Sequence, residues 1–198
     1  AGIVIFYTFT GGYLAVCRTD FFQGTLMFFA IIVVPVTGIM VAGGPAETIS
    51  SLHALNPNYF NMFTDATGLT LSFTAIASLI GWGLGYFGQP HILVRFMSIT
   101  SAKEIPQATR IAMVWVIFSL FFAVASGLVG RVVLGDALTG VNAETVFMVL
   151  NEQFFNSFMA AIIISAILGA IMSTSSGQLL VTACLLYTSP SPRDMRRS

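Results

Sequence analysis

The chain has 198 residues, of which 56% are hydrophobic and 8% are charged, and its formal net charge is zero. A water-soluble domain normally carries about 25% Asp, Glu, Lys and Arg, so this composition, with a mean hydropathy of +0.88, predicts a membrane protein. A neutral chain has no electropositive field for nucleic acid, and two cysteines are too few for a disulfide framework or a cysteine-rich metal site. These classes are excluded.

Long stretches without Asp, Glu, Lys or Arg mark the expected membrane spans, because a bilayer core about 30 Å thick needs roughly 20 apolar residues in a helix. The first stretch begins without Met or a basic flank, and we interpret it as the end of an earlier span. No alternating pattern indicates a β-barrel, so the spans are helical. We therefore expect an all-α polytopic membrane protein, with one partial and four complete spans at approximately 1–17, 21–43, 67–94, 111–133 and 154–183.

Lys and Arg are unequally divided between the two sets of connecting loops. Arg18 and three basic residues within loop 95–110 fall on one side, whereas Arg131 alone falls on the other. Short loops rich in Lys and Arg stay in the cytoplasm. The sequence therefore predicts a multi-pass protein of the cell (plasma) membrane with loop 95–110 in the cytoplasm.

The third expected span contains four Gly and one Pro between Gly81 and Pro90. Gly costs about 1 kcal/mol and Pro about 3 kcal/mol relative to Ala in a helix interior, and irregular backbone at membrane depth is tolerated where it lines a cavity. The segment indicates either a discontinuous transporter helix or glycine contacts between packed helices, and spacing does not separate these. Trp82 and Tyr86 would share a face and could stack on a small solute, or belong to an interfacial aromatic belt.

A dense run of small polar residues, Ser173 to Gln178, interrupts the otherwise apolar last span. Ala170, Ser173 and Thr174 follow an i, i+3, i+4 spacing that places a carbonyl and two hydroxyls on one helical face. Such oxygens suit a hard cation such as Na⁺. Serine and threonine in membrane helices also bond back to their own backbone or pack against neighbours, and spacing alone favours that packing interpretation.

The composition changes abruptly after Ala183. Residues 184–198 read CLLYTSPSPRDMRRS and resemble a translated sequencing adaptor, so we expect a non-native tail and restrict the transporter region to residues 1–183. A native basic segment beside the membrane is the alternative.

Three motifs of the chain resemble the sodium/solute symporter family. They are Gly11-Gly12 with Ala15-Val16, Thr19-Asp20 and Gln23; the block Gly81-Trp-Gly-Leu-Gly-Tyr-Phe-Gly-Gln-Pro-His91 with Arg95-Phe96; and Ser165-Ala-Ile-Leu with Met172-Ser-Thr174. The resemblance covers about residues 2–183. It implies a fragment of a five-plus-five inverted-repeat (LeuT-like) transporter, which is not competent alone because the first core helix is missing.

The resemblance also implies roles for single residues. Trp82, Tyr86 and Pro90 would line the solute site, with proline as the implied solute, while the Ala170 carbonyl and the Ser173 and Thr174 hydroxyls would hold sodium. Na⁺ would be the coupling ion and the only metal, without an organic cofactor, and the lipid bilayer and the solute would be the other partners. Nucleic acid is not a partner.

Two alternative functions remain open at this stage. A symporter with the same sodium site could carry another amino acid, a carboxylate or a sugar. A non-transporting membrane helical subunit or channel could use the glycines and hydroxyls for packing alone. An enzyme is not expected, because the first 183 residues contain no cluster of His, Asp, Glu and Cys within a span.

Overall fold

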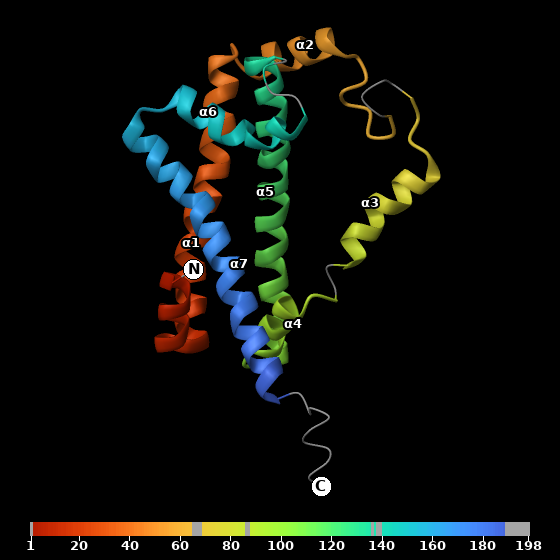
Figure 1. Ribbon diagram of the computed structural model, residues 1–198. Helices are drawn as coiled ribbons and strands as arrows, with labels where there is room; N and C mark the ends of the chain where they lie inside the picture. Colours follow the sequence, from red (N-terminus) through yellow and green to blue (C-terminus); the bar gives the residue numbers. More distant parts are fainter. Residues whose placement is uncertain (1, 65–68, 86–87, 136, 138–139, 189–198) are drawn as a thin grey trace.

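The computed structural model describes residues 2–64, 69–85, 88–135, 137 and 140–188, and these residues are predominantly helical (Figure 1). The expected all-α class is confirmed. In this part of the chain, extended pairing amounts to an isolated bridge between Thr64 and Thr70. The helices in chain order are α1 (Gly2–Val41), α2 (Pro45–Leu55), α3 (Phe73–Gly85), α4 (Pro90–Met97), η2 (Ala102–Glu104), α5 (Ile105–Leu134), η3 (Gly140–Thr145), α6 (Val146–Phe154) and α7 (Ser157–Thr188).

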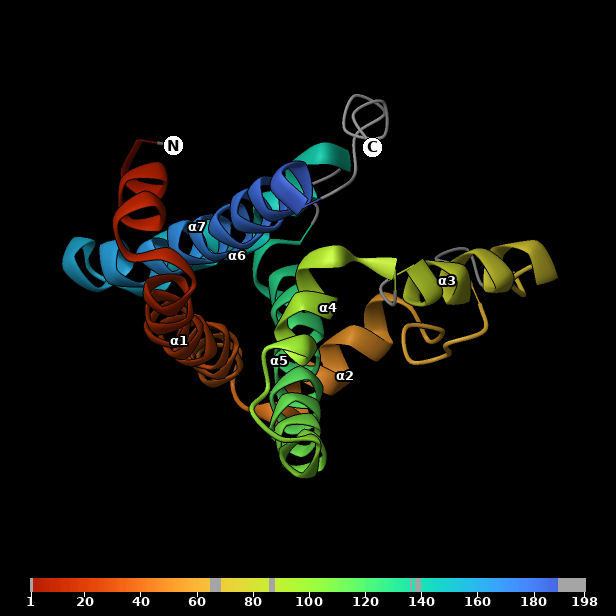
Figure 2. The same ribbon diagram turned by 90° about the horizontal axis from the view of Figure 1, so that it is seen from below.

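Three long helices, α1, α5 and α7, form the body of the molecule (Figures 1 and 2). By length and composition, three segments of the described chain could cross a membrane: Gly2–Val41, Ala102–Leu134 and Ser157–Cys184. Helices α2 and α6 lie at one end of this body and α4 lies at the other, while α3 leans away from the long helices. Loop 95–110 and the polar connections around α2 and α6 are therefore at opposite ends.

The boundaries of the helices differ in detail from the expected spans. The expected spans 111–133 and 154–183 fall largely within α5 and α7. The expected span 67–94 corresponds to two shorter helices, α3 and α4. The first two expected spans are joined in one helical segment, and the chain turns at Gly12 rather than at the charged residues 18–20.

The turn at Gly12 has a backbone reason. Gly12 has φ 56° and ψ −153° inside α1, a conformation that is essentially restricted to glycine. The preceding Gly11 has no room for a side chain either, because a Cβ there would collide with Cβ of Ala15. The Gly11-Gly12 pair thus lets residues 2–11 leave the axis of the rest of α1 (Figure 1).

The buried core lies between α1, α5, α6 and α7, and its members are aliphatic, with two alanines among them. Its buried residues are Ala30, Val34, Val129, Leu150, Ile163 and Ala166. Small side chains allow membrane helices to approach closely, which maximises van der Waals contact where lipid supplies no hydrophobic driving force. Outside this core, large apolar residues such as Phe9 and Phe73 are exposed, as expected of helices that face lipid or further helices.

Candidate functional site

The glycine-rich segment of the expected solute site is interrupted in the structure. Helix α3 ends at Gly85, and α4 begins at Pro90 after Gln89, whose backbone is extended at φ −80° and ψ 115°. Pro90 stands at the first helical position, where its missing N–H leaves no intrahelical bond unmade. The backbone therefore does not continue as one helix through this segment.

The structure describes the three expected solute-binding residues to different extents. Pro90 is exposed at the start of α4, and Trp82 belongs to α3 but its side chain is outside the described part. Tyr86 lies outside the described residues. The structure therefore places the backbone on both sides of the expected solute site, but it does not bring these three side chains together.

The expected sodium-binding residues all lie on α7. Ser173 is half-buried and Thr174 is exposed, and neither hydroxyl makes a hydrogen bond to the described residues. The neighbouring Ser176 is fully buried, and its hydroxyl donates to the Ser173 carbonyl at 3.0 Å. Part of the hydroxyl run therefore bonds back to its own helix, as the packing interpretation expected, whereas the oxygens of Ser173 and Thr174 are available to another group.

Ala170 lines a cavity of about 410 Å³ between α1, α5, α7 and the η3–α6 region. Its walls are mostly apolar, and the hydroxyl of Ser126 in this cavity donates to the Phe122 carbonyl at 2.9 Å. The lining contains neither Ser173 nor Thr174. The cavity itself therefore does not join the three expected sodium ligands.

Two polar residues of α1 face α7 near the hydroxyl run. Gln23 packs against Gly169, with its Cβ 3.4 Å from the position that a Cβ at Gly169 would occupy. Ser173 lies one turn beyond Gly169 on α7 and shares its face. Both Gln23 Oε1 and Asp20 Oδ1 are buried without a hydrogen-bond partner among the described residues. Buried oxygens without a donor are unusual, and they lie beside the helix that carries the expected sodium ligands.

Asp20 and Gln23 belong to one of the family-like motifs, but the sequence alone assigns no role to either residue. Their spacing of three residues, which places both on one face of a helix, is the available signal. The hydroxyl of Thr19, in the same motif, is hydrogen-bonded within its own helix, because it donates to the carbonyls of Ala15 and Val16.

An ion pair connects α1 to α4 close to these oxygens. Arg95 Nη2 lies 2.7 Å from Asp20 Oδ2. The side chain of Asp20 is 15% exposed and that of Arg95 is 51% exposed. Residues 75 positions apart thereby hold α4 against α1.

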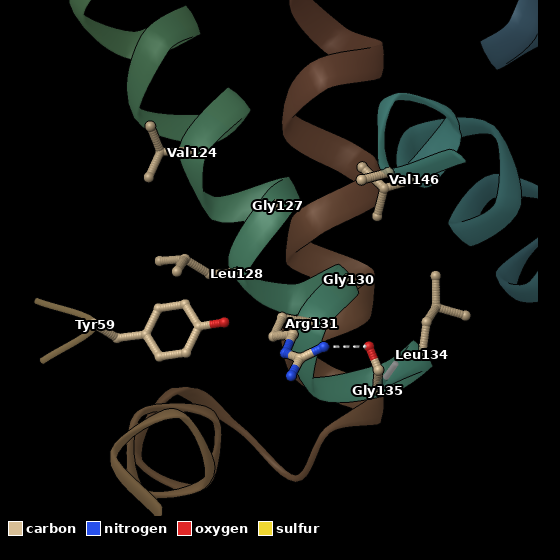
Figure 3. Close-up of a pocket in the computed structure, with 10 residues that line it drawn as sticks. Tyr59, Val124, Gly127, Leu128, Gly130, Arg131, Leu134, Gly135 and Val146 are labelled. Carbon is tan, nitrogen blue, oxygen red and sulfur yellow. Dashed lines mark hydrogen bonds between the residues drawn. The ribbon is translucent and has the colours of Figure 1, made fainter. Parts of the chain in front are cut away.

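A second cavity lies at the opposite end of the molecule, where α5 ends (Figure 3). It has a volume of about 350 Å³ and is lined by Tyr59 from the loop after α2 and by Arg131 and its neighbours on α5. Arg131 Nη1 donates to the carbonyl of Gly135 at 3.0 Å, an arrangement that closes the C-terminal end of the helix. None of the expected site residues lines this cavity.

The fold and the site define a polytopic α-helical membrane protein in which α4, the helix after the interruption, packs against the hydroxyl-bearing helix α7. The chain belongs to the sodium:solute symporter family, whose model matches residues 1–189. It is 46% identical to the high-affinity proline transporter PutP of Bacillus subtilis over 198 residues, which are 100% of this chain and 41% of that protein.

Two further relatives are similar to the same extent. The sodium/proline symporter of Staphylococcus aureus is 47% identical over 187 residues, and sodium/proline symporter 2 of Staphylococcus saprophyticus is 45% identical over 187 residues; each match covers 94% of this chain and 35% of the relative. The chain thus spans between 35% and 41% of the length of these relatives. No solved structure matches the chain significantly.

Proposed function

We propose that this chain is part of a transporter that couples the entry of Na⁺ to the uptake of proline across the cell membrane. The observation that carries the proposal is the identity of 45–47% over 187–198 residues with relatives named as proline transporters or sodium/proline symporters. At the level of the chain, the interrupted α3–α4 segment and the available oxygens beside α7 support it. The proposed role is transport and not catalysis.

In this proposal, Trp82, Tyr86 and Pro90 contact the solute, and the Ala170 carbonyl and the Ser173 and Thr174 hydroxyls contact Na⁺. Hard cations take oxygen ligands, so the buried oxygens of Gln23 and Asp20 on the facing helix extend the same set. An apolar ring suits stacking on Trp82 or Tyr86. Loop 95–110 faces the cytoplasm, which places Asp20 and Arg95 toward the inner end of the transporter.

The energetics of the proposed cycle follow from linkage. Each Na⁺ that enters contributes about 2.3 kcal/mol per 100 mV of membrane potential, in addition to its concentration gradient. If sodium raises the affinity for the solute, the solute must raise the affinity for sodium by the same factor. Coupling therefore requires that sodium and the solute both favour the same conformation of the transporter.

Uptake of labelled proline into membrane vesicles that contain the full-length transporter tests the function. We expect uptake that depends on an inward sodium gradient and is competed by unlabelled proline. Stronger competition by another amino acid, a carboxylate or a sugar would keep the sodium coupling and change the solute. Absence of sodium-dependent uptake of any of these solutes would favour a non-transporting subunit or channel.

The sodium assignment is tested by Thr174→Val, which removes one proposed ligand with little change in shape. We expect the sodium concentration for half-maximal uptake to rise about tenfold or more, as for the loss of a charge-assisted contact of about 1.5–3 kcal/mol. Thr182→Val is the matched control on the same helix, because the Thr182 hydroxyl donates to the Gln178 carbonyl at 2.8 Å. Equal sodium dependence of the two variants would reject the assignment of Thr174.

A further inference from the structure

Helix α4 and the residue after it contact α1 through two side-chain interactions. Besides the contact between Arg95 and Asp20, the hydroxyl of Tyr13 in α1 forms a hydrogen bond with Ser98 Oγ, and Ser98 Oγ donates to the Arg95 carbonyl at 2.8 Å. The hydroxyls of Tyr13 and Ser98 thus form a short hydrogen-bonded chain that ends at the carbonyl of Arg95, the residue that also pairs with Asp20. Both interactions therefore involve the last turn of α4 and the residue that follows it.

The ion pair is only partly open to water. Asp20 is the more buried partner, and its second oxygen, Oδ1, is enclosed without a hydrogen-bond donor in the described part of the chain. Ion pairs that are fully exposed contribute little, but a carboxylate withdrawn from water is strongly destabilised when its counter-charge is removed. Arg95 is therefore the counter-charge that faces the more buried Asp20 carboxylate.

Arg95 also lies against α7. Its Nη2 is 3.6 Å from the position that a Cβ at Gly177 would occupy, and Gly177 follows Thr174 by three residues. A space of only about 20 Å³ remains between these groups, and its walls include Asp20, His91, Arg95, Gly177 and Val181. The guanidinium thus fills the gap where α1, α4 and α7 meet.

This junction joins the two proposed sites. Helix α4 starts at Pro90, which belongs to the proposed solute site, and five residues later it presents Arg95 to α1 and α7, which carry the proposed sodium ligands. We propose that the Asp20–Arg95 pair is a latch at the inner end of the α1–α7 interface, in which Arg95 is a positioning residue that couples the solute-bearing segment to the sodium-bearing helix. The role of this latch in coupling rests on the proposed function.

While the latch is closed, α4 covers the inner end of the interface and Val181 stays buried. When α4 moves with the interrupted segment, the pair separates and water reaches this end of α1 and α7. The latch therefore makes opening at the inner end depend on the position of a helix that begins at the solute site.

Thiol accessibility tests the latch without any transport measurement. The full-length transporter is prepared with Cys17→Ser, Cys184→Ser and Val181→Cys, since Cys17 and Cys184 are the two cysteines of this chain and Val181 is only 6% exposed; any other native cysteines are replaced by Ser. In membranes, we expect Arg95→Gln to raise the rate at which this cysteine reacts with a small polar maleimide by about tenfold, within the range usual for coupling between sites. Arg95→Lys, which keeps the charge, should stay close to the parent.

Further variants separate the latch from a general loss of structure. Arg110→Gln removes an exposed arginine from the same end of the molecule and should leave the reaction rate unchanged. Asp20→Asn should raise the rate, and adding Arg95→Gln to it should produce little further increase, because both changes break one interaction. Gly177→Leu displaces the guanidinium without removing a charge and should also raise the rate, whereas Gly177→Ala should not.

The outcomes distinguish the latch from the transport function. If neither Arg95→Gln nor Gly177→Leu changes the reaction rate, or if Arg110→Gln changes it equally, the latch is wrong, whether or not proline uptake depends on sodium. If the rates change as expected in a protein without sodium-dependent uptake, the proposed function fails and the latch stands. In an active transporter, Arg95→Gln should also reduce the effect of solute on the affinity for sodium about fivefold or more, and an undiminished effect would overturn its role in coupling.

Discussion

Val129 of α5 occupies the space that a side chain at Gly38 of α1 would need. A Cβ at position 38 would collide with Val129 Cγ1, and it would also lie 3.0 Å from Cε2 of Phe154. Val129 is fully buried and belongs to the core, and its branched side chain has little freedom to move aside. The absence of a side chain at position 38 therefore sets how closely α1 and α5 approach.

Gly38→Ala is expected to destabilise the protein by about 1–3 kcal/mol, as is usual when an extra methyl group is forced into a packed core. Thermal unfolding of the purified full-length protein in detergent measures the effect. Gly24→Ala is the matched control in the same helix, because among the described residues no atom beyond the adjoining backbone of α1 lies within 4 Å of a Cβ at that position. The control should be neutral or slightly stabilising, since Ala is the better helix former, and an equal loss in both variants would contradict the packing argument.

Gly12→Ala is expected to cost about 1–3 kcal/mol or to straighten the turn, because φ 56° with ψ −153° is not accessible to alanine without strain. The geometry can be measured by the distance between spin labels at Phe6 and Phe21, both of which are exposed. A straight helix would separate these positions by about 22 Å along its axis. We expect a shorter distance in the parent and an increase toward this value in the variant, whereas Gly2→Ala should change nothing.

Asn151 ties α6 to the start of α7. Its side chain is fully buried, and its Nδ2 donates to the Ala160 carbonyl at 3.0 Å. Asn151→Leu removes this bond and leaves a buried carbonyl without that donor, so we expect a loss of about 1–3 kcal/mol in the same unfolding assay. Asn142→Leu replaces an exposed asparagine in η3 and should have little effect; similar losses at both positions would reject the role of the buried bond.

Trp82→Phe tests the proposed solute contact. The smaller ring and the lost N–H should raise the proline concentration for half-maximal uptake severalfold, because aromatic contacts of this kind contribute about 0.5–1.5 kcal/mol beyond the buried area. The sodium dependence measured at saturating proline should not change. Trp115→Phe is the control, since Trp115 lies on α5 and stacks on Phe28 with a centroid distance of 6.4 Å; a solute response shared by both variants would argue against a site at Trp82.

The helical class and the positions of the longest helices follow from features that the sequence displays locally. Charged residues cannot be placed in lipid without cost, so the uncharged stretches delimit the bodies of α5 and α7 well. The glycine content of residues 81–90 left a discontinuous helix and glycine packing equally open, and the extended backbone of Gln89 before Pro90 agrees with the discontinuous helix. The turn at Gly12 falls inside an uncharged stretch, so the positions of charged residues cannot predict it. The Gly11-Gly12 pair is the local sequence feature that marks it.

The contacts around the candidate site depend on tertiary structure. Asp20 and Arg95 are 75 residues apart, so no helical or strand periodicity in the sequence predicts their contact. The expected sidedness of the loops placed both residues at the same end of the molecule, but it did not pair them. Similarly, the contact of Gln23 with Gly169 requires α1 and α7 to be antiparallel neighbours. A spacing rule identifies which residues share a helical face, but it does not identify the helix on which that face packs.

The extensive contact between α1 and α7 joins the first and the last helices of this chain. Synthesis proceeds from the N-terminus, so α1 enters the bilayer long before α7 has been translated. Until then, Gln23 lacks the helix against which it packs, and this surface of α1 is open to lipid headgroups, water or the insertion machinery. Assembly of the region around the candidate ion site consequently has to wait for the translation of α7, and truncation before Ser157 would leave α1 inserted without this packing partner.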